Sequence, residues 1–218
     1  MPRVNKEYLI EKKNCILDCA MEIMQEKPLY QITMRDIIKK MGVSQGAIYR
    51  YYSGLEEIFM ELMNRETAKI TILEEMNHIV EKDCNEAEKL KLMFIELGRY
   101  IIEVEESIGG KFYFEFLVHF AFDKKNQLEV LSNLNYKQNL MAAQGIMIQY
   151  IYQMVQEGKF QPIYPMDSIV SYVSVTIDGI SNDYALMIGA KQVQSSAVMD
   201  PKIMFQMLGE CVLKHLGK

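Results

Sequence analysis

Residues 32–59 read ITMRDIIKKMGVSQGAIYRYYSGLEEIF and combine two short helical segments with a turn at a single glycine. Thr33 is a good N-cap for a helix over Met34–Met41, because its hydroxyl can accept a hydrogen bond from the first turn. Gly42 then ends that helix, since glycine adopts the left-handed conformation of a helix C-terminus most easily. A helix pair joined by so short a turn predicts a helix-turn-helix.

The helix after the turn has an unusual surface composition. We expect it over Gln45–Tyr51, with Ser44 as its N-cap. Gly46 and Ala47 let its backbone approach a neighbouring surface closely, and Gln45 can pair with a base edge. The spacing alone leaves an ordinary core hairpin open, but this composition favours a helix that enters the DNA major groove.

The rest of the chain also reads as helices. Half of the 218 residues are apolar, and only 12 Gly and 5 Pro interrupt them, so the sequence predicts an all-α fold with a large core. Apolar residues recur three and four positions apart, as on one face of a helix. We expect about nine helices: Lys6–Glu26, Met34–Met41, Gln45–Tyr51, Leu55–Glu81, Asn85–Ser107, Lys111–Phe122, Gln127–Glu157, Met166–Ala190 and Pro201–Leu216.

Several protein classes are disfavoured by what the sequence lacks. The four Cys form no CxxC pair and the three His are scattered, so we expect no metal, no cofactor and a reducing, cytoplasmic location. No apolar run approaches the roughly 18 residues that span a bilayer. No nucleophile triad or phosphate loop is present, and we interpret the lone His119 as a core or pocket residue rather than a catalyst. The chain is therefore predicted not to be an enzyme.

The charge is divided unevenly along the chain. The net charge of −5 argues against a protein that coats nucleic acid. Residues 1–55, however, contain nine Lys and Arg against six Asp and Glu, a net charge of +3, which leaves −8 for the remainder. A modestly basic head that can meet phosphates is thus joined to an acidic body.

Residues 32–59, together with the preceding helix that ends CAMEIMQEK, resemble the DNA-binding signature of the TetR family of bacterial transcriptional repressors. The resemblance covers about the first sixty residues. It implies a helix-turn-helix DNA-binding domain over 1–54 and an effector-binding and dimerisation domain over 55–218. It also implies a repressor that binds a palindromic double-stranded operator as a homodimer and is released by a small-molecule effector.

The residues and the resemblance together give a set of candidate DNA contacts. Leu55 departs from the family pattern, which usually has a lysine on a phosphate at that position. A helical ligand-binding protein without DNA affinity therefore stays open as a rival reading. The candidate DNA-binding residues are Thr33, Arg35, Ser44, Gln45, Gly46, Ala47, Tyr49, Arg50 and Tyr51.

Aromatic and Met residues are concentrated beyond residue 60. A plain core is the simpler reading, but the rings of 112–116 cannot all face one way on a helix, which favours a pocket or a partner subunit. Glu96, Glu103 and Glu115 lie among these rings, so a largely apolar effector could also be cationic. The candidate pocket residues are Phe94, Phe112, Phe116, Glu115, His119, Phe120, Tyr150, Met154 and Tyr172.

The last two helices carry an apolar stripe with small residues beside it, which permits close helix packing. The resemblance implies that they form a four-helix interface with a second subunit, whereas the pattern alone also allows a buried helix pair within one subunit. The candidate interface residues are Ile169, Val173, Ile177, Ile180, Tyr184, Ile203 and Met207.

Overall fold

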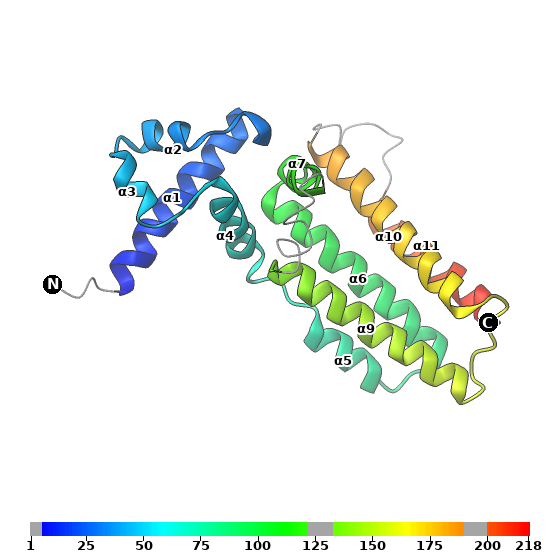
Figure 1. Ribbon diagram of the computed structural model, residues 1–218. Coiled ribbons are helices and arrows are strands. Elements are labelled where there is room, and N and C mark those ends of the chain that lie inside the picture. Colours follow the sequence, from blue (N-terminus) through cyan, green and yellow to red (C-terminus); the bar gives the residue numbers. More distant parts are fainter. Residues whose placement is uncertain (1–5, 122–132, 190–199) are drawn as a thin grey trace. The chain divides into compact units, whose positions relative to one another are not determined.

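The computed structural model describes residues 6–121, 133–189 and 200–218 (Figure 1). These residues form helices and no strand, so the all-α prediction is confirmed. Within these ranges no helix is both long and apolar enough to cross a membrane. The elements are α1 (Lys6–Glu26), η1 (Leu29–Gln31), α2 (Met34–Met41), α3 (Gln45–Tyr49), α4 (Leu55–Thr67), α5 (Leu73–Glu81), α6 (Glu86–Ile108), α7 (Gly110–Ala121), α9 (Asn135–Gln156), α10 (Met166–Gly189) and α11 (Pro201–His215).

One expected helix is in fact two. The segment 55–81 is interrupted between α4 and α5, so the prediction of a single helix there is wrong. The interruption contains the β-branched residues Ile70, Thr71 and Ile72, which favour helix less than straight side chains do. Ile72, the residue just before α5, is buried. The expected start of another helix at Gln127 lies outside the described residues.

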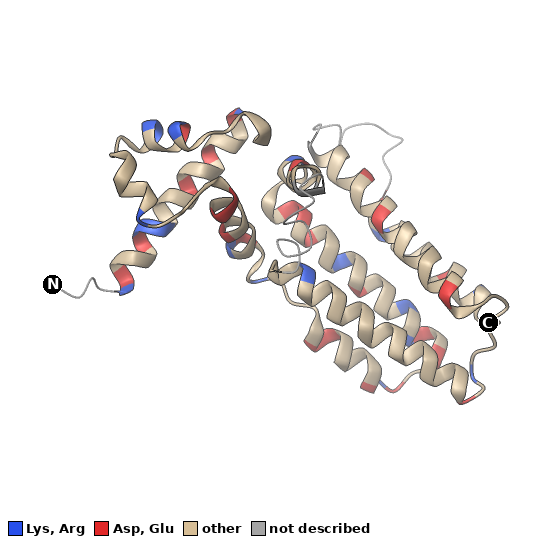
Figure 2. Cartoon of the chain, in the orientation of Figure 1, with Lys and Arg blue, Asp and Glu red and all other residues tan. Residues whose placement is uncertain are grey.

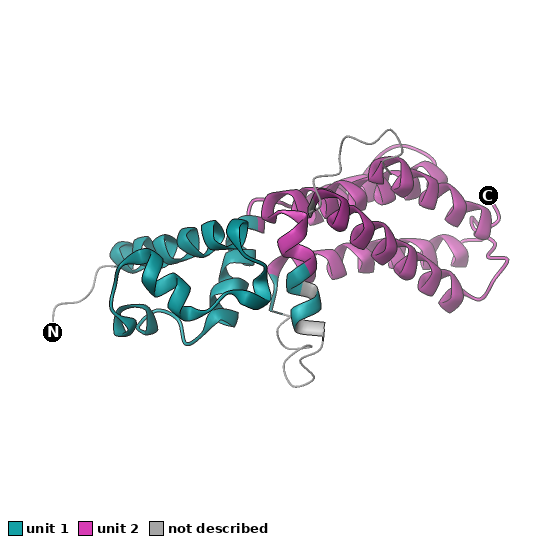
Figure 3. Cartoon of the chain, turned by 90° about the horizontal axis from the view of Figure 1, so that it is seen from above, with its two compact units in different colours: residues 1–66, 115–134 teal, residues 67–114, 135–218 magenta. Residues whose placement is uncertain are grey.

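The chain divides into two compact units (Figure 3). Unit 1 comprises residues 1–66 and 115–134, and unit 2 comprises 67–114 and 135–218. The predicted domain boundary after residue 54 falls just before α4, whereas unit 1 includes nearly all of that helix. Helix α7 contributes its first residues to unit 2 and the rest to unit 1.

Unit 1 is built around the inward face of α1. Its buried side chains recur at the spacing of one helical face, which is why the sequence forms this amphipathic helix. The helices that pack there bring few but fully buried residues, among them Ile37 of α2 and Ile48 of α3. The core of this unit includes Ile16, Leu17, Ala20, Ile23, Met24, Ile37, Ile48, Tyr52, Ile58, Phe59, Leu62 and Met63.

In unit 2, helices α6 and α11 approach each other closely through two glycines. A Cβ atom on Gly98 would lie 2.5 Å from the ring of Phe205, and one on Gly209 would lie 3.2 Å from Phe94. Each helix therefore carries a phenyl ring and a glycine four residues apart, and each ring covers the glycine of the other helix. Both rings are fully buried.

This arrangement predicts that Gly98→Ala destabilises unit 2. The added methyl group has no room against Phe205, so we expect a loss of about 1–3 kcal/mol in the free energy of unfolding. Urea denaturation followed by circular dichroism measures it. Gly145→Ala is the matched control in α9, where a Cβ would meet no atom within 4 Å, and it should be neutral or stabilising. Equal stability of Gly98→Ala and the wild type would contradict the packing described.

Candidate functional site

The first helix of the helix-turn-helix is held by a capping box. The Asp36 amide donates to the Thr33 hydroxyl at 3.3 Å, and the Thr33 amide donates to Asp36 Oδ2 at 2.8 Å. The Thr33 hydroxyl also donates to Asp36 Oδ2, at 2.7 Å. Gly42 ends the helix with φ of 65°, in the left-handed region. The local signals of residues 33–42 therefore act as the sequence predicted, and the Thr33 hydroxyl is committed to the cap.

Lys27 reinforces the same cap. Its ammonium lies 2.6 Å from Asp36 Oδ1. The hydrogen bond from Lys27, together with those from Thr33, lowers the pKa of Asp36 to about 2. The carboxylate stays ionised at the helix N-terminus, where the helix dipole also favours a negative charge.

Several lysines of the head are neutralised within unit 1. Lys40 pairs with Glu26 at 2.9 Å and with Glu22 at 3.1 Å. Lys13 pairs with Glu61 at 2.7 Å and lies over the ring of Tyr52. These cations are less available to an outside anion than a count of Lys and Arg implies.

Three exposed cations around the helix-turn-helix make no ion pair with the described residues. Arg35 and Lys39 lie four residues apart on one face of α2, and Arg50 follows α3. Figure 2 shows Lys and Arg on α2 and near the end of α3, whereas Asp and Glu dominate α4. Lys39 was absent from the predicted set, although its spacing from Arg35 could have indicated it.

Helix α3 presents its predicted polar face outward. Gln45, Gly46, Tyr49 and Arg50 are exposed, and Ile48 is buried. No atom lies within 4 Å of the position that a Cβ on Gly46 would take. The Ser44 residue stands at the N-cap with extended backbone, but its side chain makes no capping hydrogen bond, and the residue is exposed. Ala47 and Tyr51 are half-buried.

The start of α4 is acidic. The amide and hydroxyl of Ser53 donate to Glu57 Oε2 at 2.7 and 2.9 Å. Glu57 thus occupies this helix start, and the exposed Glu56 adds a second carboxylate. With Leu55 in place of a lysine, this end of α4 has no cation to hold a phosphate.

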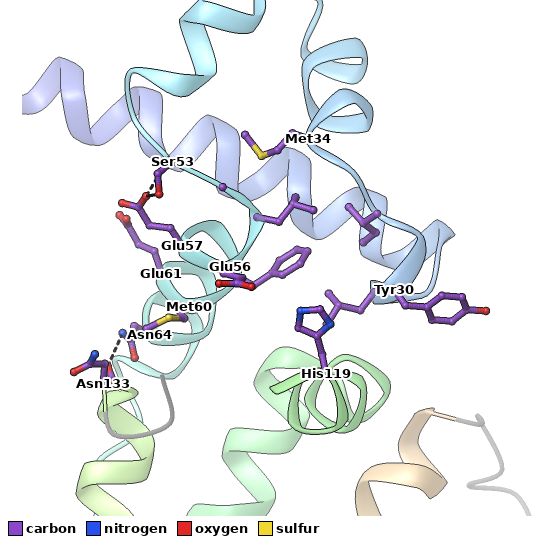
Figure 4. Close-up of a pocket in the computed structure, with 15 residues that line it drawn as sticks. Tyr30, Met34, Ser53, Glu56, Glu57, Met60, Glu61, Asn64, His119 and Asn133 are labelled. Carbon is purple, nitrogen blue, oxygen red and sulfur yellow. Dashed lines mark hydrogen bonds between the residues drawn. The ribbon is translucent and has the colours of Figure 1, made fainter. Parts of the chain in front are cut away.

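A hollow of ≈ 940 Å³ lies within unit 1, beside α4 (Figure 4). Three acidic residues line it, Glu56, Glu57 and Glu61, and His119 points into it from α7. His119 is the one predicted effector residue in this lining. The acidic lining disfavours an anion there.

Glu115 of α7 holds the N-terminus of η1. Its Oε2 accepts a hydrogen bond from the Leu29 amide at 2.7 Å. Leu29 is buried, and η1 leads directly into the cap of α2. Glu115 is thus a structural partner of the head.

The remaining predicted effector residues are distributed over α6, α7, α9 and α10. Phe94 covers Gly209, and the Tyr150 hydroxyl donates to the Glu86 carbonyl at 3.1 Å. The exposed ring of Tyr172 lies edge-on to His215 at 5.5 Å between centroids. Phe112, Phe116 and Met154 are buried, and the side chain of Phe120 lies outside the described residues. Their role in a pocket stays a prediction.

The acids expected to attract a cation are already paired. Arg99 Nε donates to Glu96 Oε2 at 2.9 Å, and Arg99 Nη1 donates to Glu103 Oε2 at 2.5 Å. A different acid of the same helix, Glu105, is fully buried. Sequence reasoning missed it, although its position four residues after Ile101 places it on the buried stripe of α6.

The predicted interface residues divide into two groups. Ile169, Val173, Ile177 and Ile180 are buried within the single chain, and the Tyr184 hydroxyl donates to Glu106 at 2.6 Å. Ile203 and Met207 are exposed. The apolar residues that α10 and α11 leave exposed are Tyr172, Val175, Leu186, Ile203 and Met207.

The DNA-binding head is similar to a known protein family. Residues 16–62 match the family model of bacterial regulatory proteins, tetR family. The uncharacterized HTH-type transcriptional regulator YfiR of Bacillus subtilis (strain 168) is 23% identical over 189 residues, 82% of each chain. The fatty acid degradation regulator FadR from Bacillus halodurans superposes with a TM-score of 0.58 at 16% identity, over 93% of this chain and 94% of that one. FadR from Bacillus subtilis, in complex with stearoyl-CoA, gives 0.55 at 17% identity, over 92% and 97%.

This chain has a capped helix pair with an exposed second helix, and its relative YfiR is named as an HTH-type transcriptional regulator. Together they indicate a helix-turn-helix DNA-binding regulator of transcription rather than an enzyme. By the match over residues 16–62, the head of the chain is similar to the DNA-binding part of the tetR family of bacterial regulatory proteins.

The cap network predicts a pH-dependent effect of Asp36→Asn. Because the pKa of Asp36 is lowered from 3.8 to about 2 in the fold, its contribution to stability is complete above pH 4 to 5 and is lost as the pH falls through about 2. We expect the substitution to lower the free energy of unfolding by about 1 kcal/mol at pH 7. Thermal unfolding should show the gap closing near pH 2. The exposed Glu56→Gln is the control, and a gap independent of pH would refute this account.

Loss of the Glu115 carboxylate should loosen η1. In Glu115→Ala the buried Leu29 amide loses its acceptor, which costs about 1–3 kcal/mol locally. Hydrogen exchange measured by NMR should show faster exchange of that amide. Glu115→Gln keeps an acceptor and should show a smaller change, and Lys111→Ala on the same helix should show none. Unchanged exchange in Glu115→Ala would exclude the contact in solution.

Proposed function

We propose that the protein is a repressor that binds a palindromic operator as a homodimer and is released by a small-molecule effector. The observation that carries the proposal is a group of three cations beside the exposed face of α3, Arg35, Lys39 and Arg50, which form no ion pair with any residue that the structure describes. Cations without an internal partner are the ones that can neutralise phosphates and release counterions.

The roles of α2 and α3 on DNA follow from their surfaces. Gln45 is exposed at the start of α3 and can reach a base edge, and the open space above Gly46 allows close approach of the backbone. Tyr49 is exposed and can donate its hydroxyl to a phosphate. Few side chains of α3 can read bases directly, so DNA shape contributes to selectivity.

The small number of phosphate contacts per head makes dimerisation important. The acidic start of α4 adds no phosphate contact. Strong binding to DNA therefore requires two heads to bind at the same time. The exposed apolar side chains of α10 and α11, such as Val175, Ile203 and Met207, are the surface proposed for the second copy. Isologous pairing through this surface gives the two-fold symmetry that a palindrome requires.

The effector is proposed to bind in unit 2. Bacillus subtilis FadR was solved with stearoyl-CoA, and this chain shares its fold. The abundant Met and aromatic residues of unit 2 suit an effector with an apolar body. Helix α7 enters both units, with Tyr113 in unit 2 and Glu115 in unit 1, and is therefore the proposed link. The effector must bind the DNA-free state more tightly to release DNA.

A salt titration tests the DNA-binding surface. Fluorescence anisotropy with DNA from upstream of the protein's own gene should show sequence-selective binding that weakens with salt. In Lys39→Ala, the slope of log affinity against log salt should fall by about one per subunit, because one phosphate contact is lost.

Lys40→Ala is the matched control, since Lys40 is the next residue on the same helix but pairs with Glu22 and Glu26. Its slope should stay near that of the wild type. Absence of selective binding by the wild type would sink the repressor proposal, and equal slopes for the two variants would remove Lys39 from the contacts.

A further inference from the structure

The hollow beside α4 in unit 1 has the size of a ligand site and an apolar floor. Its ≈ 940 Å³ lies within the range of about 300–1,000 Å³ that small-molecule sites occupy. Some of its apolar side chains are buried, whereas others are only half-buried and gain from contact with an apolar molecule. The apolar lining residues are Leu29, Ile32, Met34, Leu55, Phe59 and Met60.

Two carboxylates of the lining have no cation beside them. Glu61 pairs with Lys13 at 2.7 Å, whereas Glu57 accepts its hydrogen bonds from the uncharged Ser53. Glu56 is exposed and forms no ion pair with any residue that the structure describes. The described residues that line the hollow include no Lys or Arg. The lining therefore carries an excess of negative charge.

The charged and apolar parts of the lining select one kind of molecule. Figure 4 shows Glu56 and Glu57 on α4, with Tyr30 of η1 and His119 of α7 on other sides of the hollow. A carboxylate or phosphate would be repelled by the acids. An inorganic cation would leave the apolar floor in contact with water. A molecule with an ammonium group and an apolar body matches both parts.

We propose that this hollow is a ligand site for an organic ammonium ion with an apolar body. The ammonium group lies at Glu56 and Glu57, and the apolar body covers Met34, Leu55 and Met60. The inference goes beyond the proposed function, because this site lies in the DNA-binding unit, whereas the effector is proposed to bind in unit 2.

The ligand contacts two segments that position the helix-turn-helix. Ile32 and Met34 flank Thr33, the N-cap of α2, and the pair Ser53–Gly54 leads into α4. All of these residues line the same hollow. Binding therefore stabilises the arrangement of α2 and α4 in which both segments meet the ligand.

Methyl NMR of the full-length protein with isotope-labelled methionine tests the site, because Met34 and Met60 line the hollow. Titration with phenylbutylammonium chloride should shift these two methyl resonances in a saturable way. Met147 and Met154, which belong to α9 in unit 2, should not shift. The affinity should fall as the ionic strength rises, because salt screens the attraction to exposed carboxylates.

Two variants probe the lining. Glu56→Gln removes a charge at an exposed position, so the fold should be kept and the affinity should fall about two- to fivefold. Leu55→Lys should weaken binding further, because it adds a cation and removes part of the apolar surface. Glu11→Gln is the matched control. It makes the same change of charge at an exposed position of α1 outside the lining, and it should bind like the wild type.

Analogues of the ligand test its chemistry. The uncharged phenylbutanol should bind more weakly, and phenylbutyrate should leave Met34 and Met60 unshifted. Equal shifts with either analogue would overturn the assignment of a cation. Equal shifts with magnesium chloride would overturn the assignment of an organic ligand.

Three other outcomes reject the site. One is the absence of saturable shifts at Met34 and Met60, or shifts at Met147 and Met154 in their place. Another is an affinity that neither Glu56→Gln nor Leu55→Lys changes. The third is a shift of Met34 and Met60 with protein concentration in the absence of ligand, which would indicate that a second copy covers the hollow. None of these titrations contains DNA, so the site is decided separately from the repressor proposal.

Discussion

Two phenyl rings and two glycines fix the distance between α6 and α11. Phe205 occupies the space that a side chain at Gly98 would need, and Phe94 covers Gly209 in the same way. Close packing of this kind tolerates no added methylene, so the two helices form a rigid pair. Helix α10 packs on both of them. Ser181 and Glu105, which come from α10 and α6, meet because of this arrangement.

The DNA-binding head depends on polar contacts as much as on its core. The Thr33–Asp36 box and Lys27 fix the start of α2, and Glu115 fixes η1 just before it. Among these contacts, the ion pair with Asp36 occupies Lys27, although a count of Lys and Arg in the sequence would include it among the cations available to DNA. The basic character of the head is therefore concentrated in Arg35, Lys39 and Arg50.

The sequence predicted the fold class and the helix pair but not the burial of Glu105. Periodicity identifies α1 and α6 because burial of one face repeats every three to four residues. It did not predict the interruption at 68–72, where Ile72 is buried. The nearby aromatic residues drew attention to Glu96 and Glu103, which pair with Arg99, whereas Glu105 was passed over. Which acid of a helix is satisfied depends on neighbours that periodicity does not identify.

The sequence by itself determined the helix-turn-helix, because its signals act between near neighbours. Thr33 and Asp36 are three residues apart, and Gly42 needs only its own backbone freedom. The tertiary structure alone decided the partners that are distant in the chain. Glu115 holds Leu29 across 86 residues, and Ser181 meets Glu105 across 76. Local hydrogen bonds follow from residue order, whereas these contacts exist only once packed helices bring the groups together.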